Sequence, residues 1–207
     1  MKRYFLFFAL TLLLLAFTVP KLRPTVRGNY PSNYFQAPVA QALLLSGPFG
    51  ELRPNHFHAG IDIKSAKGVV GDAVYSAADG FVSRIKVDKS GYGNSLYISH
   101  PNGYTTVYAH LDKFKSDIEK FVKAQQYIQK KFEVDINLTH EKFPVSQGDE
   151  IGKMGNTGSS NGAHLHFEVR ETNTDNPINP LLFGFRVVDN IRSEERRVGK
   201  ECRSRWS

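Results

Sequence analysis

Short hydrophobic runs bounded by turn residues follow one another along the chain from about residue 40 to residue 189. Many are rich in β-branched and aromatic residues, which is typical of strands. The Asn102-Gly103 pair between two such runs favours a tight hairpin joining antiparallel strands. The pattern therefore predicts a mainly β domain, built as a compact antiparallel β-sheet or sandwich. The expected strands include 73–77, 80–87, 95–99, 104–110 and 164–170.

Residues 116–131 break this pattern and predict one amphipathic helix inserted in the β domain. Ser116 and Glu119 have the spacing of a capping box, in which the Ser accepts a backbone N–H and the Glu reaches back. The stripe behind them is expected to pack on the sheet, which is the usual role of such stripes. A lid or a partner-docking helix is the alternative. The stripe consists of Ile118, Phe121, Val122, Gln125 and Ile128.

The N-terminal end has the features of an export signal. Lys2 and Arg3 precede an uncharged run rich in Leu and Phe, residues 4–20. We expect residues 1–19 to be a signal peptide or an N-terminal anchor, which allows a membrane tether through residues 4–20. A linker is expected over 20–39 and the folded domain over 40–189. Either form of the signal places the domain outside the cytoplasm, in the periplasm or cell envelope, with anchoring to the inner membrane as one option.

The C-terminal end has a different composition, RSEERRVGKECRSRWS over residues 192–207. This string matches the translation of a common short-read sequencing adapter, so we expect that it is not native. Cys202 and Trp206, the single Cys and Trp of the chain, both lie in it. Without the tail the chain has no cysteine, which excludes disulfides and cysteine chemistry.

Charge adds little to the functional argument. The formal net charge is +7, and it falls to +4 without the tail, which carries six Arg or Lys residues and three Glu residues. A mild positive charge suits an anionic wall polymer and equally suits an ordinary solvated surface. No compact basic cluster with interleaved aromatic residues occurs in the sequence, which argues against nucleic acid as a partner.

Histidines supply the candidate chemistry. Two spacings stand out among the seven histidines: His58 and Asp62 form an H-x-x-x-D pair, and His164 and His166 form an H-x-H pair. In the second segment Leu, Phe and Val alternate with His164, His166 and Glu168. A strand period of two therefore places both histidines on one face, above an apolar face.

The first pair is expected to lie in an extended segment as well. Gly60 and the β-branched residues beside it disfavour helix, and we expect Gly60 to leave open space above the side chains of His58 and Asp62. Together with His166 they would supply two imidazoles and one carboxylate with one coordination position left free. Catalytic zinc needs such a set. Non-haem Fe(II) also binds two His and one carboxylate and is the rival interpretation. His56, His100 and His140 are expected to have ordinary surface or structural roles.

The chain from Phe57 to Phe183 resembles the lysostaphin-type, or LytM-like, zinc endopeptidases, which hydrolyse peptidoglycan. The resemblance covers most of the domain in the family's order. It is carried by the stretches FHAGIDI (57–63), VYSAADGFV (74–82), GYGNSLYISHPNGYTTVYAHL (91–111), VSQGDEIGKMGNTGSSNGAHLHFEVR (145–170) and NPLLF (179–183).

The resemblance implies a fold of the duplicated-hybrid-motif type and one Zn²⁺ per domain. The metal ligands would be His58, Asp62 and His166, and His110 and His164 would be the catalytic histidines that do not bind the metal. The implied activity is hydrolysis of peptide cross-links in the peptide stems of peptidoglycan, with zinc-activated water as nucleophile. The division of roles between the two catalytic histidines stays open.

Two other functions compete with this one. Some relatives are non-catalytic scaffolds or activators of other wall hydrolases, and these typically lose metal ligands, whereas this chain keeps all of them. A metallopeptidase acting on a secreted protein is the other alternative. Compared with short family members the chain has an insertion at about residues 112–143, which we expect to shape the edge of the cleft. The glycine-rich stretch 155–162 would either let an extended substrate approach the backbone or form a turn-rich loop.

Overall fold

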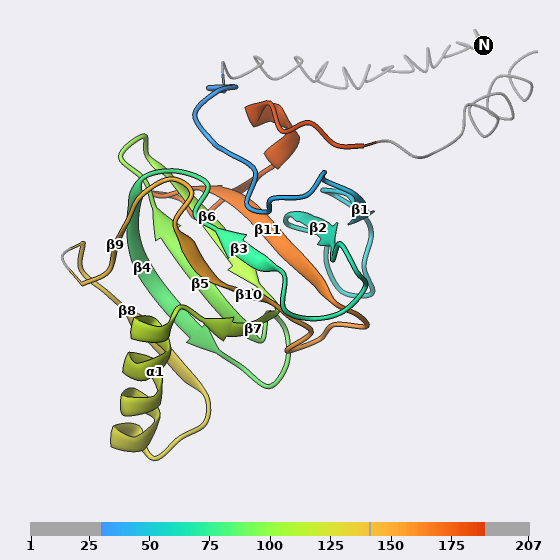
Figure 1. Cartoon of the computed structure of the whole chain (residues 1–207). Coiled ribbons are helices and arrows are strands. Elements are labelled where there is room, and N and C mark those ends of the chain that lie inside the picture. The colour runs from blue at the N-terminus through green and yellow to red at the C-terminus, as the bar shows by residue number, and fades with distance from the viewer. Residues whose placement is uncertain (1–29, 141, 189–207) are drawn as a thin grey trace, which may run out of the picture.

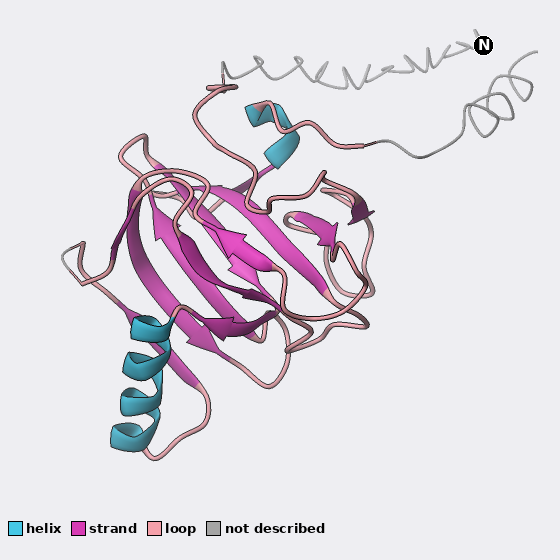
Figure 2. Cartoon of the chain, in the orientation of Figure 1, coloured by secondary structure: helices cyan, strands magenta, loops and turns pink. Residues whose placement is uncertain are grey.

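The computed structural model describes residues 30–140 and 142–188, which form two antiparallel β-sheets and one long helix (Figures 1 and 2). The predicted β class, the antiparallel pairing and the single long helix are confirmed. The elements are β1 (Leu45–Gly47), β2 (Ile61–Lys64), β3 (Ala73–Tyr75), β4 (Gly80–Val87), β5 (Asn94–Ser99), β6 (Tyr104–Ala109), β7 (Leu111–Phe114), α1 (Ser116–Gln129), β8 (Val134–Asn137), β9 (Pro144–Val145), β10 (Glu150–Met154), β11 (His164–Glu171), β12 (Pro177–Ile178) and the 3₁₀ helix η1 (Pro180–Phe183).

The larger sheet has the strand order β1-β2-β11-β6-β5-β4-β8, with β12 added to β11 and β9 added to β4. The smaller sheet has the order β3-β10-β7 and lies across one face of the larger sheet (Figure 1). The chain passes from the larger sheet to the smaller one at His110, the residue between β6 and β7. The hairpin at Asn102-Gly103 joins β5 to β6, as predicted.

One hydrophobic cluster fills the space between the sheets and holds them together. It combines residues of the large sheet, such as Ile85 and Phe167, with residues of the small sheet, such as Val74 and Ile151, all without exposed surface. Phe35 and Val39 also belong to it. Both precede residue 40, where we expected the domain to start. Part of the segment expected to be a linker therefore packs on the core.

Helix α1 departs from its prediction at both ends. The residue that caps its N-terminus is Lys115, and no side chain makes a capping hydrogen bond there, so the predicted capping box at Ser116 is wrong. Glu119 instead accepts a hydrogen bond from the backbone N–H of Phe114, in the strand before the helix. The apolar stripe packs only over its first turns, where Ile118 and Val122 are buried, while Ile128 near the other end is exposed.

Several predictions concern residues outside the described part of the chain. The signal or anchor over residues 1–19 and the adapter-like tail over 192–207 both lie there. Among the described residues, no helix has the length and apolar character needed to cross a membrane.

Candidate metal centre

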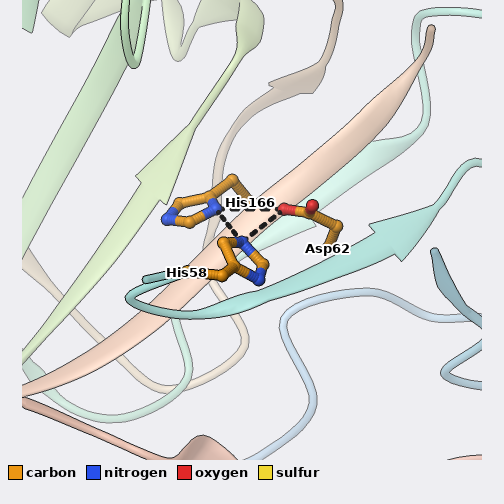
Figure 3. A group of neighbouring side chains, drawn as sticks. All are labelled: His58, Asp62 and His166. Carbon is orange, nitrogen blue, oxygen red and sulfur yellow. Dashed lines mark hydrogen bonds and ion pairs between the residues drawn. The ribbon is translucent and has the colours of Figure 1, made fainter. Parts of the chain in front are cut away.

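Three buried side chains converge on one point of the larger sheet (Figure 3). The Nε2 atom of His58 lies 3.0 Å from Oδ1 of Asp62 and 2.9 Å from Nδ1 of His166. The distance from Nδ1 of His166 to Oδ1 of Asp62 is 3.0 Å. The structure therefore brings together His58, Asp62 and His166, although up to 108 residues of sequence separate them.

The pairing of β2 with β11 positions this group. His166 lies directly opposite Asp62 in the antiparallel register, so their side chains leave the same face of the sheet. His58 comes from the loop just before β2. The expectation that Gly60 leaves open space is wrong: a Cβ atom there would lie 2.3 Å from the carbonyl oxygen of Phe167. Glycine is needed because this loop lies directly against β11.

The outward nitrogens of both imidazoles have hydrogen-bond acceptors. Nδ1 of His58 donates to the carbonyl oxygen of Pro48 at 2.8 Å, and Nε2 of His166 donates to Glu168 at 2.7 Å. An imidazole that keeps its proton on this outward nitrogen directs a lone pair to the centre, and this is the tautomer that can bind a metal. Two nitrogen lone pairs and a carboxylate oxygen facing one another fit a divalent cation that accepts N and O donors, and zinc meets this description.

Asp62 also contacts Arg53, a residue that the sequence analysis missed. Burial disfavours ionisation of Asp62, but hydrogen bonds from His166 and His58 and their charge, when these rings are protonated, outweigh burial and lower the pKa of Asp62 below the ordinary range. The guanidinium of Arg53 donates to the second carboxylate oxygen at 2.8 Å and forms an ion pair with Glu51. The hairpin over residues 50–58 holds Arg53 there. The H-x-x-x-D pattern alone does not predict this contact between Arg53 and Asp62.

His110 lies beside the group, at the point where the chain changes sheets. Its φ of 60° is left-handed, a conformation that residues other than glycine adopt mainly where the surroundings enforce it. Nδ1 of His110 donates to the carbonyl oxygen of Thr157 at 2.8 Å. Burial lowers the pKa of His110 to about 4; the nearby His164 and His166 add to this, and the bond to Thr157 opposes it.

His164 is partly exposed and faces His110. The two ring centroids are 4.7 Å apart. Nδ1 of His164 donates to the carbonyl oxygen of Gly162 at 2.9 Å, while its Nε2 lies 3.6 Å from Oδ1 of Asp62. The five histidine and aspartate residues singled out from the sequence thus occupy one site, three of them within direct contact distance and two beside these.

Behind His166 lies a layer of polar side chains that the sequence analysis did not assign to the site. Glu168 is fully buried and contacts His166, the hydroxyl of Tyr92 and Arg170. Burial alone would raise the pKa of Glu168. The hydrogen bonds and charge of His166 and Arg170 outweigh burial and lower this pKa to about 2, so the carboxyl is ionised. The strand period that places His164 and His166 on one face also places Glu168 there, so the sequence held a signal for it.

A cleft of about 660 Å³ opens above the group, with a wall of the loop residues 159–163. Just before these loop residues, a Cβ atom on Gly158 would lie 2.4 Å from the backbone nitrogen of Gly93, so this glycine allows two loops to pack closely. That contact supports the turn-rich interpretation of the stretch and positions the Thr157 carbonyl that holds His110. In the described structure the insertion at 112–143 supplies no lining residue, so the expectation that it shapes the cleft edge is not met.

The other three histidines have different surroundings. His56 is exposed and lines the cleft. His100 is buried and makes hydrogen bonds with the Asp79 carbonyl and the Thr106 hydroxyl. His140 is exposed, with its ring edge-on to Phe81.

Comparison with known proteins identifies the family. The model of peptidase family M23 matches residues 56–132 and 131–180, which is more than half of the chain and includes all the residues of the candidate centre. The chain belongs to peptidase family M23. The M23 match also agrees with the predicted resemblance to lysostaphin-type peptidases.

Individual M23 relatives differ in what their names state. The chain is 34% identical over 142 residues to the DD-carboxypeptidase/endopeptidase Mpg of Neisseria meningitidis, covering 66% of this chain and 26% of that protein. It is 32% identical over 124 residues to the murein hydrolase activator NlpD of Escherichia coli, covering 60% of this chain and 25% of that protein. The matches thus span only about a quarter of these longer relatives.

A solved structure supports the same assignment. A zinc-containing peptidase from Vibrio cholerae superposes with a TM-score of 0.51 and 25% identity, over 76% of this chain and 41% of that one. The M23 fold is therefore common to both, and the family contains peptidases as well as a protein named as an activator.

Proposed function

We propose that this M23 protein is a zinc-dependent endopeptidase that hydrolyses peptide cross-links of bacterial peptidoglycan. The observation that carries the proposal is the convergence of His58, Asp62 and His166 at the base of a cleft, with His110 and His164 beside them. A zinc ion held by these three side chains supplies Lewis-acid chemistry, which makes water a better nucleophile and polarises the scissile carbonyl.

His110 and His164 supply the proton transfers. Each holds its Nδ1 proton against a backbone carbonyl, which leaves the Nε2 lone pair free to accept a proton. One of them takes the proton of the attacking water, and the other, once protonated, stabilises the oxyanion or gives a proton to the leaving amine. Since both present the same tautomer, hydrogen bonding alone does not divide these roles.

The name of the NlpD relative supports a second candidate function, a scaffold that activates other wall hydrolases. Such a protein needs its surface and not its metal. The intact donor set and the two imidazoles beside it favour catalysis, since an activator has no use for them.

The experiment is incubation of the full chain with purified sacculi, with and without a chelator, followed by mass spectrometry of the released muropeptides. Peptide fragments that disappear with chelator and with His166→Ala support the proposed hydrolase. No release, together with stimulation of an added amidase that His166→Ala leaves unchanged, supports the activator. If the protein neither releases fragments nor stimulates the amidase but does cleave a secreted protein, it is a peptidase with another substrate.

We also propose that the protein acts outside the cytoplasm, in the periplasm or envelope. The support is the hydrophobic run at residues 4–20 and the wall-related name of the NlpD relative. A fusion of residues 1–29 to a reporter active only after export tests this, and a reporter that stays inactive contradicts it. Membrane-bound reporter indicates an anchor, and released reporter indicates a cleaved signal.

A further inference from the structure

Glu168 is a charged side chain without exposed surface, directly behind the candidate metal centre. One of its oxygens accepts a hydrogen bond from Nε2 of His166 at 2.7 Å and another from the Tyr92 hydroxyl. The second oxygen accepts from Nε of Arg170 at 2.5 Å. A carboxylate in such a position is costly unless its partners satisfy it, and here both oxygens are satisfied.

The partners of Glu168 are themselves held in place. Arg170 donates to Asp175 at 2.8 Å and to the Tyr92 hydroxyl at 3.2 Å. The Tyr92 ring stacks on the His166 ring, with centroids 5.1 Å apart and planes inclined by 29°. His166 is thus held by its strand, by a hydrogen bond and by a stacked ring.

We propose that Glu168 is a positioning residue that fixes the tautomer of His166, so that the Nδ1 lone pair faces His58 and Asp62. Arg170 and Tyr92 hold the carboxylate in the orientation that does this. The inference rests on the proposed function, because the tautomer matters only if Nδ1 binds a metal. A carboxylate that accepts from the outer nitrogen of a ligating imidazole also strengthens the inner nitrogen as a donor.

The substitution Glu168→Gln exposes this role through its hydrogen-bonding pattern. If the introduced amide directs its oxygen to His166, its NH₂ group faces the N–H of Arg170, and two donors oppose each other. If the amide instead adopts the flipped orientation, its NH₂ group faces His166. This donor needs an acceptor, so Nε2 of His166 must carry a lone pair and no proton. The imidazole proton then moves to Nδ1, into the metal centre.

A second change relieves the conflict. In the double variant Glu168→Gln/Arg170→Gln, the new side chain at position 170 offers an amide oxygen to the NH₂ group of the new side chain at position 168. The amide at 168 can then direct its oxygen to His166, as the carboxylate does. The double variant should therefore bind zinc better than Glu168→Gln, although it carries one more substitution, and Arg170→Gln is the matched single control.

The measurement is zinc affinity of the full chain, by competition with a chromophoric chelator. We expect Glu168→Gln to bind zinc roughly 10–100-fold more weakly than the unsubstituted protein, and the double variant to regain most of the loss. Thermal unfolding of the zinc-free proteins shows whether each variant is folded. Long-range ¹H–¹⁵N spectra at alkaline pH of the zinc-free Asp62→Ala protein, which lacks the competing carboxylate 3.0 Å from Nδ1, should show the His166 proton on Nε2, and on Nδ1 after Glu168→Gln.

The outcomes separate the two proposals. Unchanged affinity and an unchanged His166 tautomer in folded Glu168→Gln would overturn the positioning role. So would a double variant that binds zinc no better than Glu168→Gln. If the unsubstituted protein does not bind zinc, the proposed function fails first, while the His166 spectra still report whether Glu168 sets the tautomer.

Discussion

At the scale of single residues, His110 and His164 are the side chains whose removal should affect chemistry without affecting metal binding. Neither belongs to the group of three converging donors, and each is held through Nδ1 by a loop carbonyl, at 2.8 and 2.9 Å respectively. The Nε2 atom of His164 is 3.6 Å from Oδ1 of Asp62, which places the ring beside the candidate metal centre. A general acid or base in this position typically contributes about 100- to 10,000-fold to the rate.

We therefore expect His164→Gln to lower the rate of fragment release from sacculi at least about 100-fold, with the zinc content unchanged. His140→Gln is the control, because His140 lies on the surface and the cleft lining does not include it. Turnover is measured by chromatography of released muropeptides and zinc by elemental analysis. Loss of zinc in His164→Gln would mean that this histidine is a ligand, and normal turnover would remove it from the mechanism.

The sequence predicts these residues to different degrees for physical reasons. His166 and His164 follow from a strand period of two, because alternation within one strand is a local property. Arg53 does not follow from any local pattern, since its contact with Asp62 depends on how the hairpin over 50–58 folds back. Glu168 lay within reach of the same alternation, but only the packing of Tyr92 and Arg170 around it shows that it is buried and ionised.

At the scale of elements, helix α1 has two halves with different surroundings. Ile118 in the first turn is 1% exposed and belongs to the core, whereas Ile128 in the last turn is 72% exposed. The helical period alone puts both on one stripe, and it holds no information on where the supporting sheet ends. Strand positions were better predicted, because each strand carries its own alternation and turn residues.

These two isoleucines give a matched pair of substitutions in one helix. Ile118→Ala should lower the free energy of unfolding by about 2–5 kcal/mol, since it removes buried methyl groups and leaves a cavity. Ile128→Ala should change it by less than about 0.5 kcal/mol, because the side chain is already in water. Urea unfolding monitored by circular dichroism compares them. Equal effects would contradict the position of the helix on the domain.

At the scale of the whole molecule, the buried His100 joins parts of the chain that are far apart in sequence. Its Nδ1 donates to the Asp79 carbonyl at 2.8 Å, in the turn between β3 and β4, and its Nε2 lies 2.8 Å from the Thr106 hydroxyl in β6. The ring also packs edge-on against Phe35, 5.3 Å away, which anchors the segment before β1. Protonation of His100 would therefore disturb several contacts at once.

The pH dependence of stability follows from this burial. Burial lowers the pKa of His100 below its model-compound value of 6.5, although the bond to the Asp79 carbonyl opposes the shift. Below about pH 6.5 the unfolded chain binds a proton at this residue that the folded chain does not bind. The contribution of His100 to the free energy of unfolding is thus complete above that pH. It is lost as the pH falls toward the folded pKa, by at most about 1.4 kcal/mol per pH unit.

We expect His100→Gln to flatten the stability profile on the acid side, because glutamine keeps a donor for the Asp79 carbonyl and does not titrate. Urea unfolding of both proteins from about pH 8 to about pH 4 tests this, and the difference between the two profiles isolates His100 from the other buried groups. The difference in free energy of unfolding between the two proteins should narrow as the pH falls below about 6.5, and it should stay constant above that pH. A difference independent of pH would mean that His100 keeps the same pKa in the folded and unfolded chains, and acid sensitivity would then have to arise at other groups.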